Sequence, residues 1–131
     1  MGTPVPHSFN KTNKPMILGI GIDIIEIERI QKAIDRWGDH FLNHVFTKQE
    51  ITYAKKHKYP TQHFAARFAA KEAVLKAIGD NAHINWKDIK IVNEANGRPQ
   101  CNLDKKKFNK KILISISHTH VYAIASAVVA A

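Results

Sequence analysis

The sequence predicts an α+β protein with a strand near the N-terminus, several helices including one long alanine-rich helix, and then a C-terminal set of antiparallel strands. Three stretches carry this prediction: the β-branched run at 17–25, the alanine-rich run at 61–78, and the apolar segments after residue 111. Strands and helices do not alternate regularly, as they would around a parallel sheet. The 131 residues amount to one domain.

Residues 1–15 differ in composition from the rest. They carry three of the five prolines and show no periodic apolar pattern. We therefore expect a disordered extension, either native or left over from expression, ahead of a single domain at 16–131.

The first predicted strand covers residues 17–25. Because side chains alternate along a strand, one face carries large apolar side chains and the other carries Gly19, Gly21 and Asp23. The apolar face consists of Leu18, Ile20, Ile22 and Ile24. An acid beside two positions without a side chain leaves room for a ligand against the backbone.

Four helices are expected after this strand. Apolar residues at three- and four-residue spacing predict an amphipathic helix over 26–37 that ends at Gly38, and a short helix follows around 41–45. Thr47-Lys-Gln-Glu50 has the form of a capping box and predicts the start of a third helix. The longest helix is predicted over 61–78, where alanine is frequent, with Gly79 at its end.

The C-terminal third is predicted to form four strands, at 89–93, 98–103, 112–117 and 122–129. Asn96-Gly97 is a typical hairpin turn between the first two. The basic stretch 105–111 is expected to form a loop or a helical turn.

Composition limits the classes of function. The net charge is +9, from 20 basic and 11 acidic residues, so the charge favours an anionic partner: a nucleic acid, a membrane surface, a phosphorylated ligand or an acidic protein. No apolar run approaches the roughly 20 residues needed to cross a membrane, and no secretory pattern is seen. Cys101 is the only cysteine, so no intrachain disulfide forms. We expect a cytoplasmic protein without a membrane partner.

Asp23 has two interpretations at this point. An acid at the end of an apolar strand is costly to bury without a partner, so Asp23 either caps a helix or pairs with a cation, or it binds a metal where loops converge.

Glu72 and Lys76 lie four residues apart in the order that favours an exposed helical ion pair, worth ~0.2–0.5 kcal/mol. The alternative interpretation is a helix directed at an anion, because Arg67 and Lys71 lie on the same otherwise apolar helix.

Two further segments carry candidate chemistry. Ser117-His118 is either a hydrogen-bonded turn or, less well supported, a nucleophile and base; neighbours on a strand point in opposite directions, so direct contact is not expected. No Gly-x-Ser-x-Gly elbow is present. Gly97-Arg98-Pro99 is either a plain hairpin turn or a guanidinium fork for phosphate. The sequence has no zinc-like spacing and no Walker loop.

Taken together and in order, these segments resemble the bacterial holo-acyl-carrier-protein synthases. The resemblance rests on Gly-Ile-Gly-Ile-Asp-Ile-Ile-Glu-Ile-Glu-Arg-Ile at 19–30, Phe-Ala-Ala-Arg-Phe-Ala-Ala-Lys-Glu-Ala-Val-Leu-Lys-Ala-Ile-Gly at 64–79, Asn-Gly-Arg-Pro at 96–99 and Ser-Ile-Ser-His-Thr at 115–119. It covers residues 16–129, and the central motif is the most specific.

The resemblance implies a 4'-phosphopantetheinyl transferase fold and an enzyme that acts on coenzyme A and apo acyl carrier protein. The products would be holo acyl carrier protein and adenosine 3',5'-bisphosphate. A magnesium cofactor and a homotrimer with active sites shared between subunits are also implied, as is a role in fatty acid biosynthesis.

Positions carry over one by one. Asp23 and Glu72 resemble the magnesium ligands, and Lys76 resembles a phosphate-binding catalytic lysine. Arg29 resembles a carrier-protein contact. The coenzyme A site would also include Arg67, Gly97, Arg98, Pro99, Ser117 and His118. Magnesium suits this set, because it keeps several waters and needs only one or two carboxylates beside substrate phosphates. Whether Glu72 acts as the base directly or through a water, and whether His118 instead holds a phosphate, stays open.

A small nucleic-acid-binding protein is the alternative from another class, supported by the net charge of +9. Against it, Phe64 and Phe68 have core-like helical spacing, no nucleic-acid-binding motif is found, and Asp23 and Glu72 have no role in it.

Overall fold

The computed structural model describes residues 16–79 and 83–131, so the predicted extension at 1–15 lies outside the described residues. The elements follow the predicted order of strand, helices and strands. They are β1 (Ile17–Glu26), α2 (Ile27–Trp37), α3 (Asp39–Val45), α4 (Lys48–Lys55), α5 (Pro60–Ile78), the 3-10 turn η1 (Trp86–Asp88), β2 (Lys90–Asn93), β3 (Pro99–Asn102), β4 (Lys111–His118) and β5 (Tyr122–Ala130).

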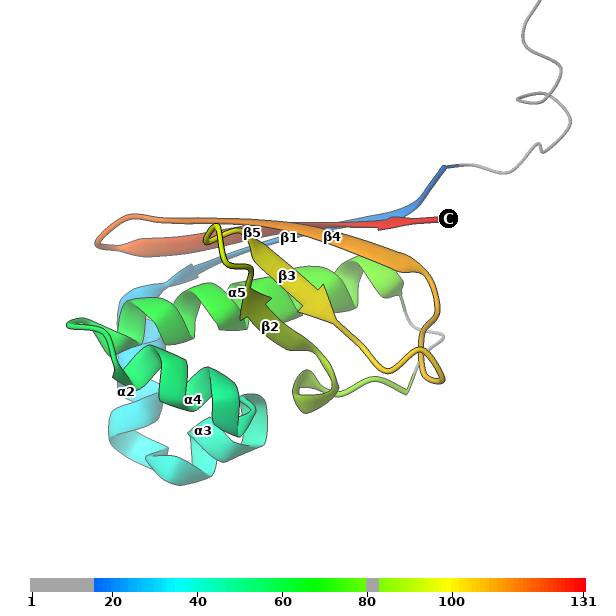
Figure 1. Ribbon diagram of the computed structural model, residues 1–131. Helices are drawn as coiled ribbons and strands as arrows, with labels where there is room; N and C mark the ends of the chain where they lie inside the picture. Colours follow the sequence, from blue (N-terminus) through cyan, green and yellow to red (C-terminus); the bar gives the residue numbers. More distant parts are fainter. Residues whose placement is uncertain (1–15, 80–82) are drawn as a thin grey trace, which may run out of the picture.

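The main sheet has three antiparallel strands in the order β1-β5-β4. β5 therefore lies in the centre, and the first strand of the chain pairs with the last along nearly its whole length, from Gly19 opposite Val129 to Glu26 opposite Tyr122. β2 and β3 form a separate hairpin. Figure 1 shows the sheet as one layer, α5 lying along one face of it, and α2, α3 and α4 gathered beyond α5.

Local signals in the sequence explain where the helices begin and end. Thr47 caps α4 in the predicted capping box, with Thr47 Oγ1 accepting from the Glu50 N–H and Glu50 Oε1 accepting from the Thr47 N–H. Gly38 and Gly79 end α2 and α5 at positive φ, as predicted. α3 begins at Asp39, two residues before the predicted start.

α5 lies against the face of β1 that carries the glycines. A Cβ atom added at Gly21 would meet the Ala73 carbonyl oxygen, and one added at Gly19 would meet the Ala77 carbonyl oxygen. The expectation of ligand room beside these glycines is therefore wrong, because the helix backbone occupies that space. The alanines of α5 make the close approach possible, since they are buried with side chains of minimal size.

The core forms between α5 and the inner face of the sheet. Alternate residues of β5 point into it (Ala123, Ala125, Ala127 and Val129), and Phe46 and Phe64 extend it toward α3 and α4. Small side chains on both layers bring the sheet and the helix close together, which fixes the distance between β1 and α5.

The outer face of the sheet is apolar, and no element among residues 16–79 and 83–131 covers it (Figure 1). Ile20, Ile22 and Ile24 of β1 are 70%, 59% and 60% exposed. Leu18, Leu113 and Tyr122 are also exposed. A contiguous apolar face of this kind marks an interaction surface.

Candidate functional site

Asp23 and Lys76 meet where β1 crosses α5. Lys76 Nζ lies 3.3 Å from Asp23 Oδ1 and donates to the Ile22 carbonyl at 3.0 Å. The Asp23 side chain is 16% exposed, whereas that of Lys76 is 57% exposed, so the pair stands at an open edge. The pairing of Asp23 with a cation, which belongs to its first interpretation, is thus confirmed. A carboxylate and an ammonium held together at an exposed edge leave both groups available to a ligand.

Glu72 does not pair with Lys76 among the described residues. Its Oε2 accepts a hydrogen bond from the Trp86 indole Nε1 at 2.8 Å, so the predicted helical ion pair is wrong. The cause is geometric. Lys76 contacts the Asp23 carboxylate and the Ile22 carbonyl on β1, whereas Glu72 accepts from the Trp86 indole of η1. Glu72 lies one turn before Lys76 and therefore on the same side of α5.

Lys71 is a buried structural residue and is not accessible to an anionic ligand in solvent. Its ammonium lies 2.7 Å from Glu50 Oε1 and donates to the carbonyls of Val45 and Trp86, each at 2.9 Å. Glu50 Oε2 accepts from the Ile91 N–H at 2.7 Å. The expectation that Lys71 is directed at an anionic ligand is therefore wrong. Burial lowers the pKa of this lysine.

Arg67 is 5% exposed, yet it retains an unsatisfied donor. Its Nη2 donates to Asn93 Oδ1 at 2.5 Å, and its guanidinium carbon lies 4.0 Å from the centre of the Tyr53 ring. Within the described residues, Arg67 Nε has no hydrogen-bond partner. Burial lowers the pKa of Arg67.

Asn93 connects Arg67 to the hairpin turn. Its Nδ2 donates to the Gly97 carbonyl at 2.9 Å, while its Oδ1 accepts from Arg67. Gly97 has φ +88°, in the region that favours glycine, and the Arg98 N–H donates to Asn96 Oδ1 at 2.9 Å. One asparagine thus couples the α5 arginine, 26 residues before it, to the Gly97-Arg98-Pro99 turn.

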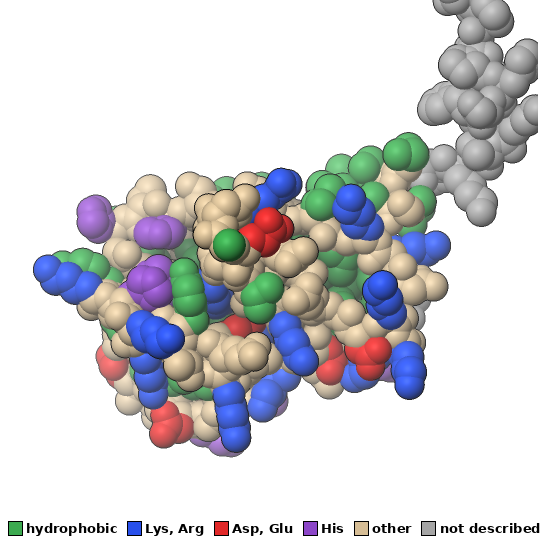
Figure 2. Space-filling view, viewed as in Figure 1, with side chains coloured by type: hydrophobic (Ala, Val, Ile, Leu, Met, Phe, Trp, Pro, Cys, Tyr) green, Lys and Arg blue, Asp and Glu red, His purple; other side chains and the backbone are tan. Residues whose placement is uncertain are grey.

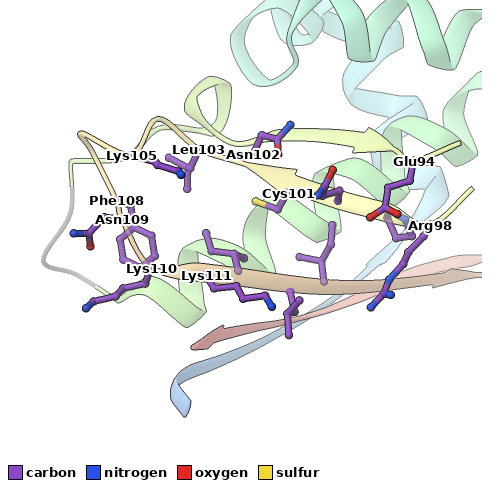
Figure 3. Close-up of a pocket in the computed structure, with 15 residues that line it drawn as sticks. Glu94, Arg98, Cys101, Asn102, Leu103, Lys105, Phe108, Asn109, Lys110 and Lys111 are labelled. Atoms are coloured by element: carbon purple, nitrogen blue, oxygen red, sulfur yellow. The ribbon is translucent and has the colours of Figure 1, made fainter. Parts of the chain in front are cut away.

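A cavity of about 720 Å³ opens between the hairpin and β4. Figure 3 shows Arg98 and Glu94 at one end of it and Lys110 and Lys111 toward the other. Pro99, Cys101 and Phe108 contribute to its lining. Burial raises the pKa of Cys101 to about 12, so the thiol stays protonated at neutral pH and does not act as a nucleophile.

Ser117 and His118 point to opposite sides of the sheet, as the strand geometry predicts. Ser117 pairs in register with Ile124 on the outer face, and His118 pairs with Ala123, whose side chain is buried. The rings of His118 and His63 are 6.4 Å apart, which places His118 near the start of α5. No Ser117–His118 hydrogen bond occurs in the described part of the chain, so a serine–histidine nucleophile is not formed by these two.

Arg29 is exposed on α2, and two further basic residues, Lys32 and Arg36, are exposed on the same helix. Lys32 pairs with Glu28 at 3.4 Å. Figure 2 shows Lys and Arg side chains scattered over the visible face of the molecule.

Four contributors to this region were not found from the sequence. Trp86, Asn93 and the second role of Glu50 depend on contacts between distant segments, which leave no local pattern. The fourth is the His57–His63 pair. One available signal for a basic cluster there was the four-residue spacing of His63 and Arg67 on one helix.

The described residues contain no group of three or more His, Cys, Asp or Glu side chains placed to hold a metal. None of the helices in residues 16–79 and 83–131 has the length and apolar character required for a membrane crossing.

A family model described as the 4'-phosphopantetheinyl transferase superfamily matches residues 19–130. The holo-[acyl-carrier-protein] synthase of Protochlamydia amoebophila is 53% identical over 119 residues, covering 86% of this chain and 98% of the relative. The enzyme of the same name from Thermodesulfovibrio yellowstonii is 46% identical over 114 residues, covering 87% and 99%.

Solved structures agree with these relatives. The Bacillus anthracis holo-(acyl-carrier-protein) synthase in complex with CoA (3',5'-ADP) superimposes with a TM-score of 0.79 at 36% identity, covering 89% of this chain and 99% of that one. The Helicobacter pylori holo-[acyl-carrier-protein] synthase in complex with coenzyme A gives a TM-score of 0.76 at 37% identity, covering 85% and 99%.

Proposed function

The chain belongs to the 4'-phosphopantetheinyl transferase superfamily and, within it, to the holo-[acyl-carrier-protein] synthases, and we propose that it moves the 4'-phosphopantetheine group of coenzyme A onto a serine of apo acyl carrier protein with Mg²⁺ as cofactor. The enzyme is a phosphopantetheinyl transferase. The transferase domain is proposed to cover residues 16–131, which the family match at 19–130 supports.

The observation that carries the proposal is the position of Lys76 against Asp23 at an open edge between α5 and β1. A diphosphate needs a cation beside it, and a metal bound to that diphosphate needs a carboxylate. Lys76 and Asp23 supply these two groups 3.3 Å apart. Glu72 adds a second carboxylate one turn earlier on α5, held by the Trp86 indole.

The residues fit magnesium by the chemistry of their donors. Asp23 and Glu72 offer carboxylate oxygens, which magnesium prefers. Two protein carboxylates suffice for this ion, because waters and substrate phosphates fill its remaining positions. The lack of a three-residue metal cluster among the described residues is consistent with such a site. When bound, the ion neutralises negative charge that develops on the diphosphate.

The proposed reaction transfers the phosphopantetheine group in one displacement at phosphorus. The carrier serine oxygen forms a bond to the β-phosphorus of coenzyme A, and the bond from that phosphorus to the bridging oxygen breaks. Adenosine 3',5'-bisphosphate leaves with the electron pair. Lys76 stabilises the developing charge on the phosphate oxygens. The serine proton passes, directly or through a water, to a carboxylate, and we assign this role to Glu72, which the Trp86 indole holds in place.

Coenzyme A is proposed to contact two groups of residues that Asn93 joins. One group is Arg67, with Ser117 and His118 at the end of β4; the other is the turn Gly97-Arg98-Pro99 at the cavity. The two similar solved structures carry coenzyme A or its 3',5'-ADP part, which supports a coenzyme A site in this chain.

The carrier protein is proposed to dock on α2 through Arg29. Arg29, Lys32 and Arg36 present positive charge on one exposed helix, and an acidic carrier would be attracted in a salt-dependent manner. The net charge of +9 supports a rapid encounter with both substrates.

A homotrimer with shared active sites is proposed as the assembly. Its support is the exposed apolar face of the main sheet, formed by Ile20, Ile22, Ile24, Leu113 and Tyr122. Covering such a face by further copies of the chain removes apolar area from water. Ser117 lies on this same face, so the assembly would bring residues of one subunit near those of another.

Replacing the two carboxylates tests the site. Asp23→Asn and Glu72→Gln are expected to reduce transfer to apo acyl carrier protein by at least about 100-fold, because each removes a charged oxygen ligand. Transfer is measured as holo carrier protein formed per minute by intact mass. Asp39→Asn, an exposed acid at the start of α3, is the matched control and should retain activity. Normal transfer by either site variant would overturn the assignment of its carboxylate.

A further inference from the structure

Three histidines, from the loop after α4, from α5 and from the end of β4, gather around His63, next to Arg67. His57 follows the end of α4, His63 lies in the first half of α5, and His118 ends β4. The rings of His57 and His63 are stacked, with centroids 3.8 Å apart and planes inclined by 32°. His118 lies 6.4 Å from His63, and Tyr53 lies 4.6 Å from His57 and 5.6 Å from His63. Figure 2 shows histidine side chains gathered at one end of the molecular surface.

The neighbouring groups disfavour a positive charge on His63. The pKa of His63 falls from 6.5 to about 4, first because of burial and then because of His57, Arg67 and His118. The groups facing His63 are Tyr53 and His57 from the α4 side, Arg67 from α5, and His118 from β4. His57 Nδ1 lies 2.8 Å from the Tyr53 carbonyl and must donate to it, which leaves Nε2 of His57 as the ring nitrogen available to a ligand. Glu50 acts on Arg67 electrostatically, but within residues 16–79 and 83–131 none of the three imidazoles or the guanidinium forms an ion pair with a carboxylate.

The orphaned donor of Arg67 points to a missing anion. Arg67 is only 5% exposed to solvent, and its Nε lacks a hydrogen-bond partner within the described residues. A buried unsatisfied N–H on a charged group is costly and calls for a ligand. Nη2 is already taken by Asn93, and Tyr53 covers the guanidinium face. An acceptor oxygen from a bound ligand would complete this group.

We propose that His57 and His63 join Arg67 and His118 in a site for a phosphate group of coenzyme A, and that this site takes up protons when the phosphate binds. This inference rests on the proposed function and deepens it, because His57 and His63 become binding residues, and His63 is neutral in the free protein and charged in the complex. An entering phosphate places a negative charge beside His63, which favours the protonated form of its imidazole.

The pH dependence follows from the sign of this change. His63 is neutral above its free pKa of about 4, and a nearby anion raises that pKa, typically by about 1–3 units. Binding therefore consumes protons between the free and the bound pKa. Affinity for coenzyme A rises as the pH falls through this window, and the contribution of His63 disappears at pH 8, where it is neutral in both states.

Calorimetry of coenzyme A binding at pH 5.5, repeated in acetate, MES and Bis-Tris buffers, measures the proton uptake from the dependence of the heat on the buffer. On binding coenzyme A, the wild-type protein is expected to take up at least about half a proton more than the His63→Phe variant takes up. The difference between the two proteins cancels proton release by the coenzyme's own phosphates. His63→Phe should weaken binding about tenfold at pH 5.5 and less than about twofold at pH 8. His63→Gln provides a second variant if the phenylalanine disturbs packing, and His57→Gln should weaken coenzyme A binding.

His40→Gln is the matched control, because His40 is exposed on α3, and it should keep the full uptake. Equal uptake in wild type, His63→Phe and His63→Gln would overturn the inference. Phosphopantetheine transfer is assayed on the same preparations. Normal transfer and binding with unchanged uptake would refute only the proton-linked site, whereas wild type that neither binds coenzyme A nor transfers would refute the proposed function itself.

Discussion

At the scale of single residues, burial decides which charged groups of α5 act on ligands. Lys71 and Lys76 lie five residues apart on one alanine-rich helix. Lys71 is fully buried against Glu50, and Lys76 is half-exposed against Asp23. A lysine ammonium therefore stabilises the fold at position 71, whereas at position 76 it is accessible to a phosphate.

Lys71→Met should destabilise the protein strongly. The substitution leaves the Glu50 carboxylate buried without its cation, and the Val45 and Trp86 carbonyls lose their donor. Breaking a buried pair in this way typically costs about 3–5 kcal/mol. The measurement is the free energy of unfolding from urea titration.

Lys32→Met is the matched control for this prediction. Lys32 pairs with Glu28 on α2, with both side chains more than 70% exposed, so its loss should cost less than about 1 kcal/mol. An equal loss of stability in the two variants would contradict the structural role of Lys71. Loss of coenzyme A binding at unchanged stability would instead restore the original expectation of an anion-binding lysine.

At the scale of elements, the close approach of β1 and α5 positions the site. Gly19 and Gly21 have no Cβ atom, so the carbonyls of Ala77 and Ala73 can lie directly on the strand. That approach brings Lys76 to the Ile22 carbonyl and to Asp23. A glycine face on the strand and an alanine face on the helix are two halves of one packing contact.

Gly21→Ala should push β1 away from α5, because the new methyl group would meet backbone atoms that cannot move independently. We expect a loss of about 1–3 kcal/mol or more in stability and a fall in transfer activity in the fraction that still folds. Thermal unfolding and the transfer assay measure the two effects. Ser126→Ala on the outer face of β5 changes a side chain of similar size and should alter neither by much. Unchanged stability of Gly21→Ala would contradict the packing described here.

The elements that the sequence predicted well are those with local signals. The capping box at Thr47, the end of α5 at Gly79 and the turn at Gly97 each depend on residues within a few positions. Pairing of β1 with β5 joins the two ends of the described chain and has no local signal, so its register was not predicted.

The site was predictable in part for the same reason. The motif positions identified Asp23, Glu72 and Lys76, and the structure shows the Asp23–Lys76 contact. The sequence did not show that Lys76 reaches Asp23 while Glu72 turns to Trp86, because both partners come from distant segments. Lys71 was misjudged because its partner Glu50 already had a complete explanation as a capping residue.

At the scale of the whole molecule, the sheet has one face in the core and one apolar face turned outward. Few monomers of this size expose a row such as Ile20, Ile22 and Ile24. The proposed trimer would cover that row and bring the Ser117 side of one subunit toward another. Assembly and activity are then linked.

Ile22→Arg should therefore convert the proposed trimer to monomers and lower transfer, because a charged group would have to be buried in the apolar contact. Light scattering coupled to size-exclusion chromatography gives the mass of the assembly. Arg36→Ala, an exposed change on α2, is expected to leave the trimer intact. A wild-type protein that is a fully active monomer would contradict the shared-site assembly.

The measurement that tests the central claim most directly is the intact mass of apo acyl carrier protein after incubation with this chain, coenzyme A and Mg²⁺. The account predicts a gain equal to one 4'-phosphopantetheine group per carrier, which is lost when a chelator removes the metal and restored when Mg²⁺ is added in excess. No gain with any of several apo carriers would contradict the proposed transfer. A full gain in the presence of the chelator would contradict the magnesium site at Asp23 and Glu72 and leave the transfer itself in place.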